Sequence, residues 1–476
     1  MCLCLRLCGM CLCVRGRRSV RLRLPFPGDR SAKRFEPGLY AYAQESEHGR
    51  AQIHLRIDQD GTGLLLINAN RALHLNPTAA RMTWLVLEDL PDSHAIRKIR
   101  KSFKVSSAQA RIDFNALRAQ INELIQPNGS CPIHDLAIDI LPPFAAKPTA
   151  PYRMDLALTY RCNDNCAHCY NARSRDYPEL GTDEWKNIID ILWDLRIPHI
   201  CFTGGEATLR TDLPELIAHA QSKGQITGLL SNGRRLADRN FLNSLLSAGL
   251  DHIQITLESH HEEVHDRMVA TSGAFRQTVE GIRNCVEAGV YLMTNTTLLA
   301  ENGPGIGDTV DFLADLGLKT IGLNALIYSG KGATVGTGML EVDLEPLLKQ
   351  VREKTDRYGQ RLIWYTPTQY CHFDPVQMEL GVKACTAALY NMCVEPNGDV
   401  IPCQSFYEPL GHILRDSWDS IWNHERAIWL RDRKYIPAAC ESCAVLGECG
   451  GGCPLTLMNR ADHEPISYQN LVPHSI

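Results

Sequence analysis

The sequence lacks three features that would assign it to a broad class at once. No apolar run approaches the ~18 residues that cross a bilayer, so we expect no membrane-spanning helix. Basic residues are not in excess, because 49 Lys and Arg stand against 54 Asp and Glu, and the net charge of −5 argues against a general nucleic-acid binder. There is no convincing secretory signal, since the apolar start is broken by Arg6 and no small-residue cleavage site follows. We therefore expect a cytoplasmic protein with no membrane and no nucleic-acid partner.

Cysteine, in contrast, is abundant. The chain of 476 residues has 19 cysteines, an odd number, and most of them lie in tight clusters. A secreted disulfide scaffold would be short and would carry a signal. In a long chain of this kind, clustered thiols are typical of metal sites.

The first 34 residues differ from the rest in composition. They hold eight Arg, one Lys and one Asp, together with five cysteines. We interpret residues 1–34 as a disordered basic, Cys-rich tail. A metal-binding tract and a targeting arm are the alternatives.

Residues 35–125 predict a small α+β unit. Strand patterns at 51–57, 64–67 and 72–75 precede three helical patterns, the first opened by Asn76 as N-cap and Pro77 at the first helical position. Three strands followed by three helices suggest a winged-helix-like module. The stretches LHLNPTAARMTWLVLEDL, IRKIRKSF and IDFNALRAQINELI resemble the peptide-chaperone domain of pyrroloquinoline quinone biosynthesis, the RiPP recognition element. The resemblance implies binding of a leader peptide as an added strand at the sheet edge beside the last helix; a domain used only for packing is the alternative.

A proline-rich linker at 126–152 precedes a segment in which strands and helices alternate, 153–345. This alternation predicts parallel βαβ units and a partial (β/α)6 barrel, an α/β fold with its chemistry at the carboxyl ends of the strands. The strands are expected at 155–159, 199–203, 226–231, 252–257, 291–297 and 320–326, and helices at 182–195 and 275–288.

The first cysteine cluster directly follows the first predicted barrel strand. Cys162, Cys166 and Cys169 have the spacing C-x3-C-x2-C. Three thiolates on a four-iron cubane leave one iron without a protein ligand, as a substrate-activating cluster requires. A zinc site would need a fourth ligand, for which His168 could be proposed, although its ring is expected to point away. An electron-transfer cluster would need a fourth Cys nearby, and none lies within 30 residues.

The loop and the motif one strand later resemble the radical S-adenosylmethionine (SAM) superfamily. Tyr170 follows the third cysteine, as in the family signature, and Gly204, Gly205 and Glu206 end the second strand as a Gly-Gly-Glu motif. Two glycines allow the backbone to approach a ligand closely. The carboxylate of Glu206 would oppose the cationic amino group of SAM.

The resemblance extends to two further strand ends. Ser231 and Asn232 stand where family members place polar SAM contacts, Thr256 where a Ser hydroxyl meets the SAM carboxylate, and Glu258 where an Asp often meets the ribose. The implied mechanism is reductive cleavage of SAM at the [4Fe-4S] cluster to methionine and a 5′-deoxyadenosyl radical, which abstracts a substrate hydrogen atom.

A second array of cysteines occupies residues 346–476. Its spacing, C-x12-G-x4-C and then C-x2-C-x5-C-x3-C, resembles the SPASM extension of radical SAM peptide maturases and implies one or two auxiliary [4Fe-4S] clusters. By matching position, Cys385, Cys403 and Cys453 would serve the first auxiliary cluster, and Cys440, Cys443 and Cys449 the second.

Two ligands remain open in this array. The family's final Cys is absent, and Asp462 and His463 are possible substitutes, besides an open iron or an incomplete cluster. For the fourth ligand of the first auxiliary cluster we favour Cys393 over Cys371.

The sequence therefore predicts a cytoplasmic radical SAM/SPASM oxidoreductase that matures a ribosomal precursor peptide through an oxidative crosslink or similar change. An electron donor such as flavodoxin or ferredoxin is the second expected partner. The first alternative is a radical SAM enzyme that acts on tetrapyrrole side chains in haem-type cofactor biosynthesis. The second is a non-catalytic iron–sulfur electron carrier. No general base can be named.

Overall fold

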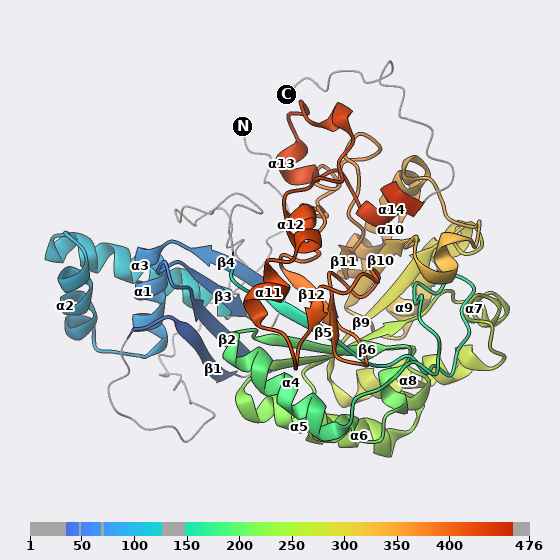
Figure 1. Ribbon diagram of the computed structural model, residues 1–476, viewed down its shortest axis with the longest axis horizontal. Helices are drawn as coiled ribbons and strands as arrows, with labels where there is room; N and C mark the ends of the chain where they lie inside the picture. The colour runs from blue at the N-terminus through green and yellow to red at the C-terminus, as the bar shows by residue number, and fades with distance from the viewer. Residues whose placement is uncertain (1–34, 47–48, 68–70, 126–147, 460–476) are drawn as a thin grey trace.

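A computed structural model describes residues 35–46, 49–67, 71–125 and 148–459 of the protein. The basic tail, most of the linker, and the candidate ligands Asp462 and His463 lie outside these ranges. Figure 1 shows an N-terminal unit at one side, a large α/β unit, and a set of short C-terminal helices above it. In the described part of the chain, no helix combines the length and the apolar character needed to cross a bilayer.

The N-terminal unit is a four-stranded antiparallel sheet followed by three helices. Its strands, in the order β1-β2-β3-β4, are Gly38–Ser46, Gly49–Ile57, Gly63–Ile67 and Arg71–Leu75. The helices are α1 (Pro77–Leu87), α2 (Asp92–Ser102) and α3 (Ser107–Ile125). The side chain of Asn76 caps α1 by accepting a hydrogen bond from Ala79 N at 2.9 Å, as the sequence predicts. The strand β1 was not predicted; it pairs with β2 along its full length.

Polar contacts fix this unit to the rest of the molecule. The side chain of Arg56 on β2 is fully buried and donates hydrogen bonds to Asp58 and to the carbonyl oxygen of Ala150, at 2.9 and 3.0 Å. Gln52 on the same strand bonds to Asp251. A buried guanidinium requires such partners, so the short segment before the barrel is held against the N-terminal sheet.

Six parallel strands form the partial barrel, and the predicted α/β class is confirmed. They are β5 (Arg153–Thr159), β6 (His199–Gly204), β7 (Ile226–Ser231), β8 (His252–Thr256), β9 (Tyr291–Leu298) and β10 (Thr320–Ala325). Their neighbours in sequence are also their neighbours in the sheet. Such strands, covered on both faces, read as short apolar runs.

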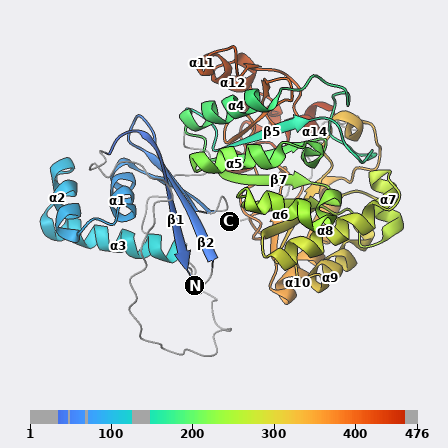
Figure 2. The same cartoon turned by 90° about the horizontal axis from the view of Figure 1, so that it is seen from below.

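Helices from the βα units cover the barrel strands. Figure 2 shows α4, α5, α6 and α8 in front of the strands when the molecule is seen from below. The seven helices of this unit are α4 (Thr182–Asp194), α5 (Leu213–Lys223), α6 (Arg239–Ser247), α7 (Glu262–Val269), α8 (Ala274–Ala288), α9 (Ile306–Asp315) and α10 (Glu341–Tyr358).

The sheet continues beyond the barrel at both edges. On one side β11 (Arg361–Trp364) pairs in parallel with β10. On the other, β12 (Asn391–Val394) pairs in parallel with β5, and β13 (Asp399–Ile401) and β14 (Gly411–His412) follow in antiparallel order. The C-terminal cysteine region is therefore built directly onto the barrel sheet, and its helices are α11 (Trp418–Trp422), α12 (Glu425–Arg431), α13 (Leu446–Cys449) and α14 (Pro454–Asn459).

Candidate functional site

The first cysteine cluster lies on the loop that leaves β5 at its carboxyl end. The loop runs along the end of α7, where Asn165 N and Ala167 N donate to the carbonyl oxygens of Val269 and Met268 at 2.9 and 3.0 Å. Arg175 braces it from the other side through the carbonyl oxygen of Cys162 at 2.6 Å. These contacts use the loop backbone, and within the loop Cys162 Sγ accepts a hydrogen bond from Asp164 N at 3.4 Å.

The three thiols of this loop influence one another. Burial raises the pKa of Cys162 to about 12 and raises the pKa of Cys166 well above its usual value, and nearby thiols and carboxylates add to both shifts. Iron binds the thiolate form. Three half-buried cysteines whose thiolate forms repel one another fit a cationic iron cluster, because the positive charge of the irons would stabilise the thiolates. Among the described residues, no three His, Cys, Asp or Glu side chains lie close enough together to share one metal ion. A four-iron cubane is a larger group and binds its three thiolates at three separate irons.

The two glycines at the end of β6 are required by the chain itself. Gly204 has φ +136°, and a Cβ there would lie 2.1 Å from the carbonyl oxygen of Thr159; a Cβ on Gly205 would lie 2.5 Å from that of Arg161. Gly205 N donates to Thr159 O at 2.7 Å. In the protein the glycines let β6 close against the backbone that leads into the cysteine loop, and their close approach to a ligand stays a prediction.

Glu206 joins the ends of β6 and β7. Its carboxylate, 1% exposed, accepts from Asn232 N at 2.8 Å, Ser231 Oγ at 3.0 Å and Thr208 Oγ1 at 2.7 Å. Burial raises the pKa of Glu206, although these hydrogen bonds oppose the shift. The Oε2 atom accepts from Asn232 N, and a carboxylate oxygen has a second lone pair. The arrangement therefore retains an acceptor for one more donor, such as a cationic amino group.

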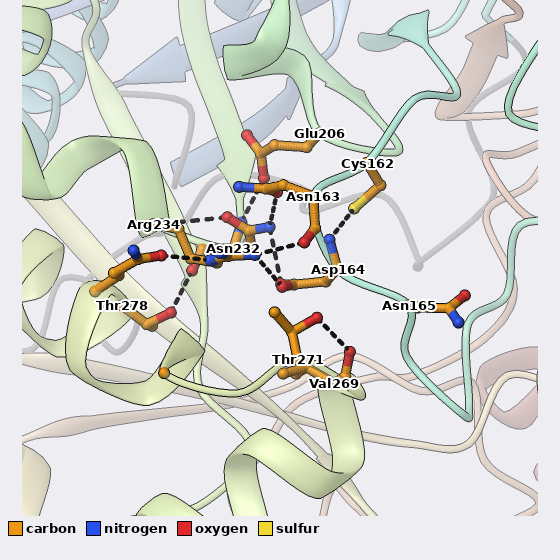
Figure 3. A network of polar contacts seen from close by, with 12 residues as sticks. Cys162, Asn163, Asp164, Asn165, Glu206, Asn232, Arg234, Val269, Thr271 and Thr278 are labelled. Atoms are coloured by element: carbon orange, nitrogen blue, oxygen red, sulfur yellow. Dashed lines mark hydrogen bonds and ion pairs between the residues drawn. The ribbon is translucent and has the colours of Figure 1, made fainter.

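A network that sequence reasoning missed connects β7 with the cysteine loop (Figure 3). The side-chain amide of Asn232 donates to Asn163 Oδ1 at 2.7 Å and to Asp164 Oδ2 at 2.9 Å. Arg234 forms an ion pair with Asp164 at 2.7 Å, and the Asp164 side chain is 3% exposed. The motif residues at the ends of β6 and β7 thus hold the loop in place through their own hydrogen bonds.

Glu258 and His168 form a second unexpected pair. His168 Nε2 lies 2.9 Å from Glu258 Oε1, and Thr297 N donates to Glu258 Oε2 at 2.9 Å. Burial lowers the pKa of His168, but the charge and hydrogen bond of Glu258 outweigh burial, so the pKa is raised. Both oxygens of Glu258 are therefore engaged by the protein, one of them by the residue between two of the loop cysteines.

The remaining predicted SAM contacts lie at neighbouring strand ends. Thr256 is the last residue of β8 and is half-buried. Burial raises the pKa of Tyr170, and a hydrogen bond with Thr203 at the end of β6 opposes that shift. The carboxyl ends of β6, β7 and β8 and the loop after β5 thus supply all of the predicted residues.

An ion pair links the radical-cluster loop to the C-terminal region. Arg173, four residues after Cys169, binds both carboxylate oxygens of Glu395 at 2.7 and 2.8 Å, and Glu395 is fully buried. Tyr160 donates to the same carboxylate at 3.1 Å. The Arg173 guanidinium also lies 5.3 Å from the ring centroids of Tyr177 and of Tyr407.

The C-terminal cysteines with the SPASM spacing separate into two groups, and Cys393 lies near the first of them, because the Cys403 thiol adds to the rise of its pKa, after burial as the main cause. Cys385, Cys403 and Cys453 lie close enough that each of the latter two raises the pKa of Cys385, after burial as the main cause. Cys440 and Cys443 act in the same way on Cys449. Cys393, which we favoured as a ligand, lies in the middle of β12, packed with Ala157, Tyr160 and Ile401.

Comparison with known proteins agrees with this geometry. A family model described as the radical SAM superfamily matches residues 156–324, and the SPASM model, described as an iron–sulfur cluster-binding domain, matches 385–444. The chain therefore contains a radical SAM domain and a SPASM domain. It is accordingly an enzyme whose cofactors are SAM and iron–sulfur clusters.

Three curated relatives are similar over large parts of the chain. The sporulation killing factor maturation protein SkfB of Bacillus subtilis (strain 168) is 28% identical over 300 residues, 63% of this chain and 70% of the relative. The PqqA peptide cyclase of Rhizobium meliloti (strain 1021) is 28% identical over 326 residues, 66% and 83% of the two chains. The Fe-coproporphyrin III synthase of Methanosarcina barkeri (strain Fusaro / DSM 804) is 34% identical over 207 residues, 43% of this chain and 50% of the relative.

Solved structures share the fold. Streptococcus suis SuiB bound to its precursor peptide SuiA has a TM-score of 0.65 at 15% identity, over 86% of this chain and 96% of SuiB. The enzyme anSMEcpe with bound AdoMet has a TM-score of 0.54 at 15% identity, over 65% and 91% of the two chains. Residues 153–476 are about two thirds of this chain, so the likeness to SuiB includes the N-terminal unit.

Proposed function

We propose that this radical SAM/SPASM enzyme modifies a ribosomally made precursor peptide. The product would be a thioether or carbon–carbon crosslink, or another oxidative change at an unactivated carbon. Two of the three relatives are named for the maturation or cyclisation of a peptide, and SuiB was solved with its precursor peptide. The proposal extends this substrate class to the present chain.

The observation that carries the proposal is the N-terminal unit and its attachment. Arg56, Gln52 and the backbone before β5 hold the unit against the barrel. In its described residues, β1 and β4 are edge strands with one partner each, and an edge strand can pair with an added peptide. We infer that a leader bound there would raise the local concentration of the core peptide at the cluster loop.

The residues of the site would bind the cluster and SAM. Cys162, Cys166 and Cys169 would hold the SAM-binding cluster, which together with SAM supplies a 5′-deoxyadenosyl radical when both are bound. Glu206 would bind the amino group of SAM through Oε2, and Thr256 its carboxylate. Glu258 would contact the ribose of SAM, and its pair with His168 also fixes the cysteine loop.

The cysteines bear on where the enzyme works and on the electron donor it uses. No disulfide joins the cysteines of the described ranges, and thiols stay reduced in the cytoplasm. We therefore propose a cytoplasmic enzyme that receives electrons from a flavodoxin or ferredoxin.

The test uses the full-length enzyme, reconstituted with iron and sulfide under anaerobic conditions. With reductant, SAM and a precursor peptide encoded beside its gene, we expect 5′-deoxyadenosine and a peptide whose mass has changed. The leader alone, added in trans, should inhibit this modification, whereas a leader of scrambled sequence should not. Modification that is unaffected by the leader would contradict a leader-binding role for the N-terminal unit.

A tetrapyrrole substrate is the second candidate. It rests on the relative of highest identity among the three, the Fe-coproporphyrin III synthase at 34%, although that match covers only 43% of this chain. Under the same conditions this candidate predicts that a coproporphyrin is converted and that every neighbouring peptide is left unchanged. That result would replace the peptide proposal.

A further inference from the structure

The second group of C-terminal cysteines lies against a chain segment outside the matched SPASM region. The backbone N–H of Tyr370 donates to Cys449 Sγ at 3.4 Å, and Cys449 Sγ contacts the carbonyl oxygen of Thr368 at 3.6 Å. Both contacts come from the segment 368–371, which ends in Cys371. The SPASM match begins only at residue 385, so family comparison does not place this cysteine.

This segment is fixed on both sides of Cys371. The carboxylate of Glu341, at the start of α10, accepts from Gln369 N at 3.2 Å and pairs with His372 Nδ1 at 2.6 Å. Gly452 packs on the same segment, because a Cβ on it would lie 2.8 Å from Gln369 Cγ. The turn between Cys449 and Cys453 and the segment that carries Cys371 therefore form one packed unit.

Electrostatic interactions between the thiols also place Cys371 next to the second group of C-terminal cysteines. Cys371 lies near enough to Cys449 and Cys440 for the charges of these two thiols to act on it, in agreement with the backbone contacts of its segment to Cys449. The thiols that act on Cys385 are Cys453 and Cys403. Cys371 thus belongs with the second group, while Cys393 lies within the sheet on β12.

We propose that Cys371, Cys440, Cys443 and Cys449 are the four protein ligands of one iron–sulfur cluster. Cys371 lies ahead of the array in sequence and supplies the fourth thiolate, and residues 454–476 contain no cysteine. Four thiolates leave no iron open, so this cluster serves electron transfer or structure and does not bind substrate. This assignment makes Asp462 and His463 unnecessary as ligands.

The test measures iron and sulfide and needs no peptide, so its result is independent of the proposed function. All variants are made in full-length protein that also carries Cys162→Ala, Cys166→Ala and Cys169→Ala, which removes the iron of the SAM-binding site. In this background, Cys371→Ala should lose iron, up to about four per chain for a cubane, and should alter the EPR spectrum of the reduced protein. The control Cys393→Ala should keep the iron content of the background.

Double variants show which cluster Cys371 serves. Cys371→Ala combined with Cys440→Ala should lose no more iron than Cys440→Ala alone, because both changes affect one cluster. Cys371→Ala combined with Cys385→Ala should lose the iron of two clusters. Additive loss with Cys440, non-additive loss with Cys385, or an unchanged iron content in Cys371→Ala would each overturn the proposal, as would zinc in place of iron and sulfide.

Alkylation provides a second readout without any substitution at these positions. Cys371 and Cys443 are exposed residues in the described chain. In metal-free full-length protein both should react with iodoacetamide, and in the reconstituted protein both should be protected. A Cys371 that stays as reactive after reconstitution as before would contradict its role as a ligand.

Discussion

The imidazole Nε2 of His54 lies 2.6 Å from the carbonyl oxygen of Gly224. This hydrogen bond joins β2 of the N-terminal sheet to the glycine that ends α5 of the barrel. Burial holds the pKa of His54 at about 4, well below its usual value, so the ring is neutral at pH 7. The junction between the two units therefore contains a histidine whose pKa is low in the folded protein and returns to its usual value when the protein unfolds.

The first prediction concerns the pH dependence of stability. When the protein unfolds, His54 regains a pKa of about 6.5, so the unfolded state binds a proton that the folded state refuses until the pH approaches 4. The free energy of unfolding therefore falls as the pH drops below about 6.5. His54→Gln keeps a donor for Gly224 but does not titrate. Between pH 7.5 and 5.5, its free energy of unfolding should therefore fall by about 1 kcal/mol less than that of the unmodified protein.

Urea unfolding at the two pH values measures this difference. The control is His94→Gln, which removes an exposed histidine of α2 instead. Its pH dependence should follow that of the unmodified protein. Equal pH dependence in the His54 and His94 variants would show that the junction does not exclude a proton.

The second prediction concerns Glu206. Its carboxylate carries the charge that would oppose the amino group of SAM, and a charge-assisted hydrogen bond contributes about 1.5–3 kcal/mol. Glu206→Gln should therefore weaken SAM binding on the order of tenfold to a hundredfold, with the iron content of the loop retained. Thr208→Ala removes one donor to the same carboxylate but leaves its charge, so its SAM affinity should stay close to that of the unmodified enzyme.

Anaerobic titration of SAM against the reconstituted variants, followed by the EPR signal of the cluster, gives the affinities. Unchanged SAM affinity in Glu206→Gln would remove the binding role and leave only the structural one. In that case Glu206 would act solely by joining the ends of β6 and β7.

The third prediction concerns the ion pair between Arg173 and Glu395. Arg173→Met leaves a fully buried carboxylate without its partner and should lower the free energy of unfolding by about 3–5 kcal/mol. Adding Glu395→Gln removes the unpaired charge and should recover part of this loss. The matched control is Arg161→Met in the pair with Glu179, where the arginine side chain is 55% exposed and the expected cost is about 0–1 kcal/mol.

Unfolding of the three metal-free variants and of the unmodified protein measures these differences at constant pH. A loss in Arg173→Met no larger than that in Arg161→Met would show that the Glu395 carboxylate is not isolated by burial. A double variant as unstable as the single one would lead to the same conclusion.

The barrel strands could be predicted from the sequence almost to the residue, because each is a short apolar run between turn residues. The strand predicted at 226–231 is β7 itself, and that at 199–203 lacks only the last residue of β6. The strands that pair far along the chain were not found. β12 is four residues long and joins the sheet beside β5 only through tertiary contact, and no local pattern predicts that neighbour.

The motif residues could be predicted in the same way, but their partners could not. C-x3-C-x2-C and Gly-Gly-Glu are local spacings that can be read directly from the sequence. The pairing of Asp164 with Arg234, and of His168 with Glu258, depends on how loops from different strands meet. For the same reason the packing of Cys393 with Ala157, Tyr160 and Ile401 could not be predicted. Its role as a ligand, favoured by its place inside the motif, stays a prediction.

The parallel pairing of β5 with β12 has a consequence for biosynthesis. Arg153 and Asn391 are register partners, yet the ribosome makes one long before the other. At about 5–20 residues per second, the outer edge of β5 stays without its neighbour for roughly 10–50 s. During that interval the loop with Cys162 has already left the ribosome, while the sheet beside it presents an open edge that can pair with other chains. Iron that reaches the first cysteines before the C-terminal region is complete would therefore bind next to a sheet that still lacks β12. The nascent chain needs protection at this open edge.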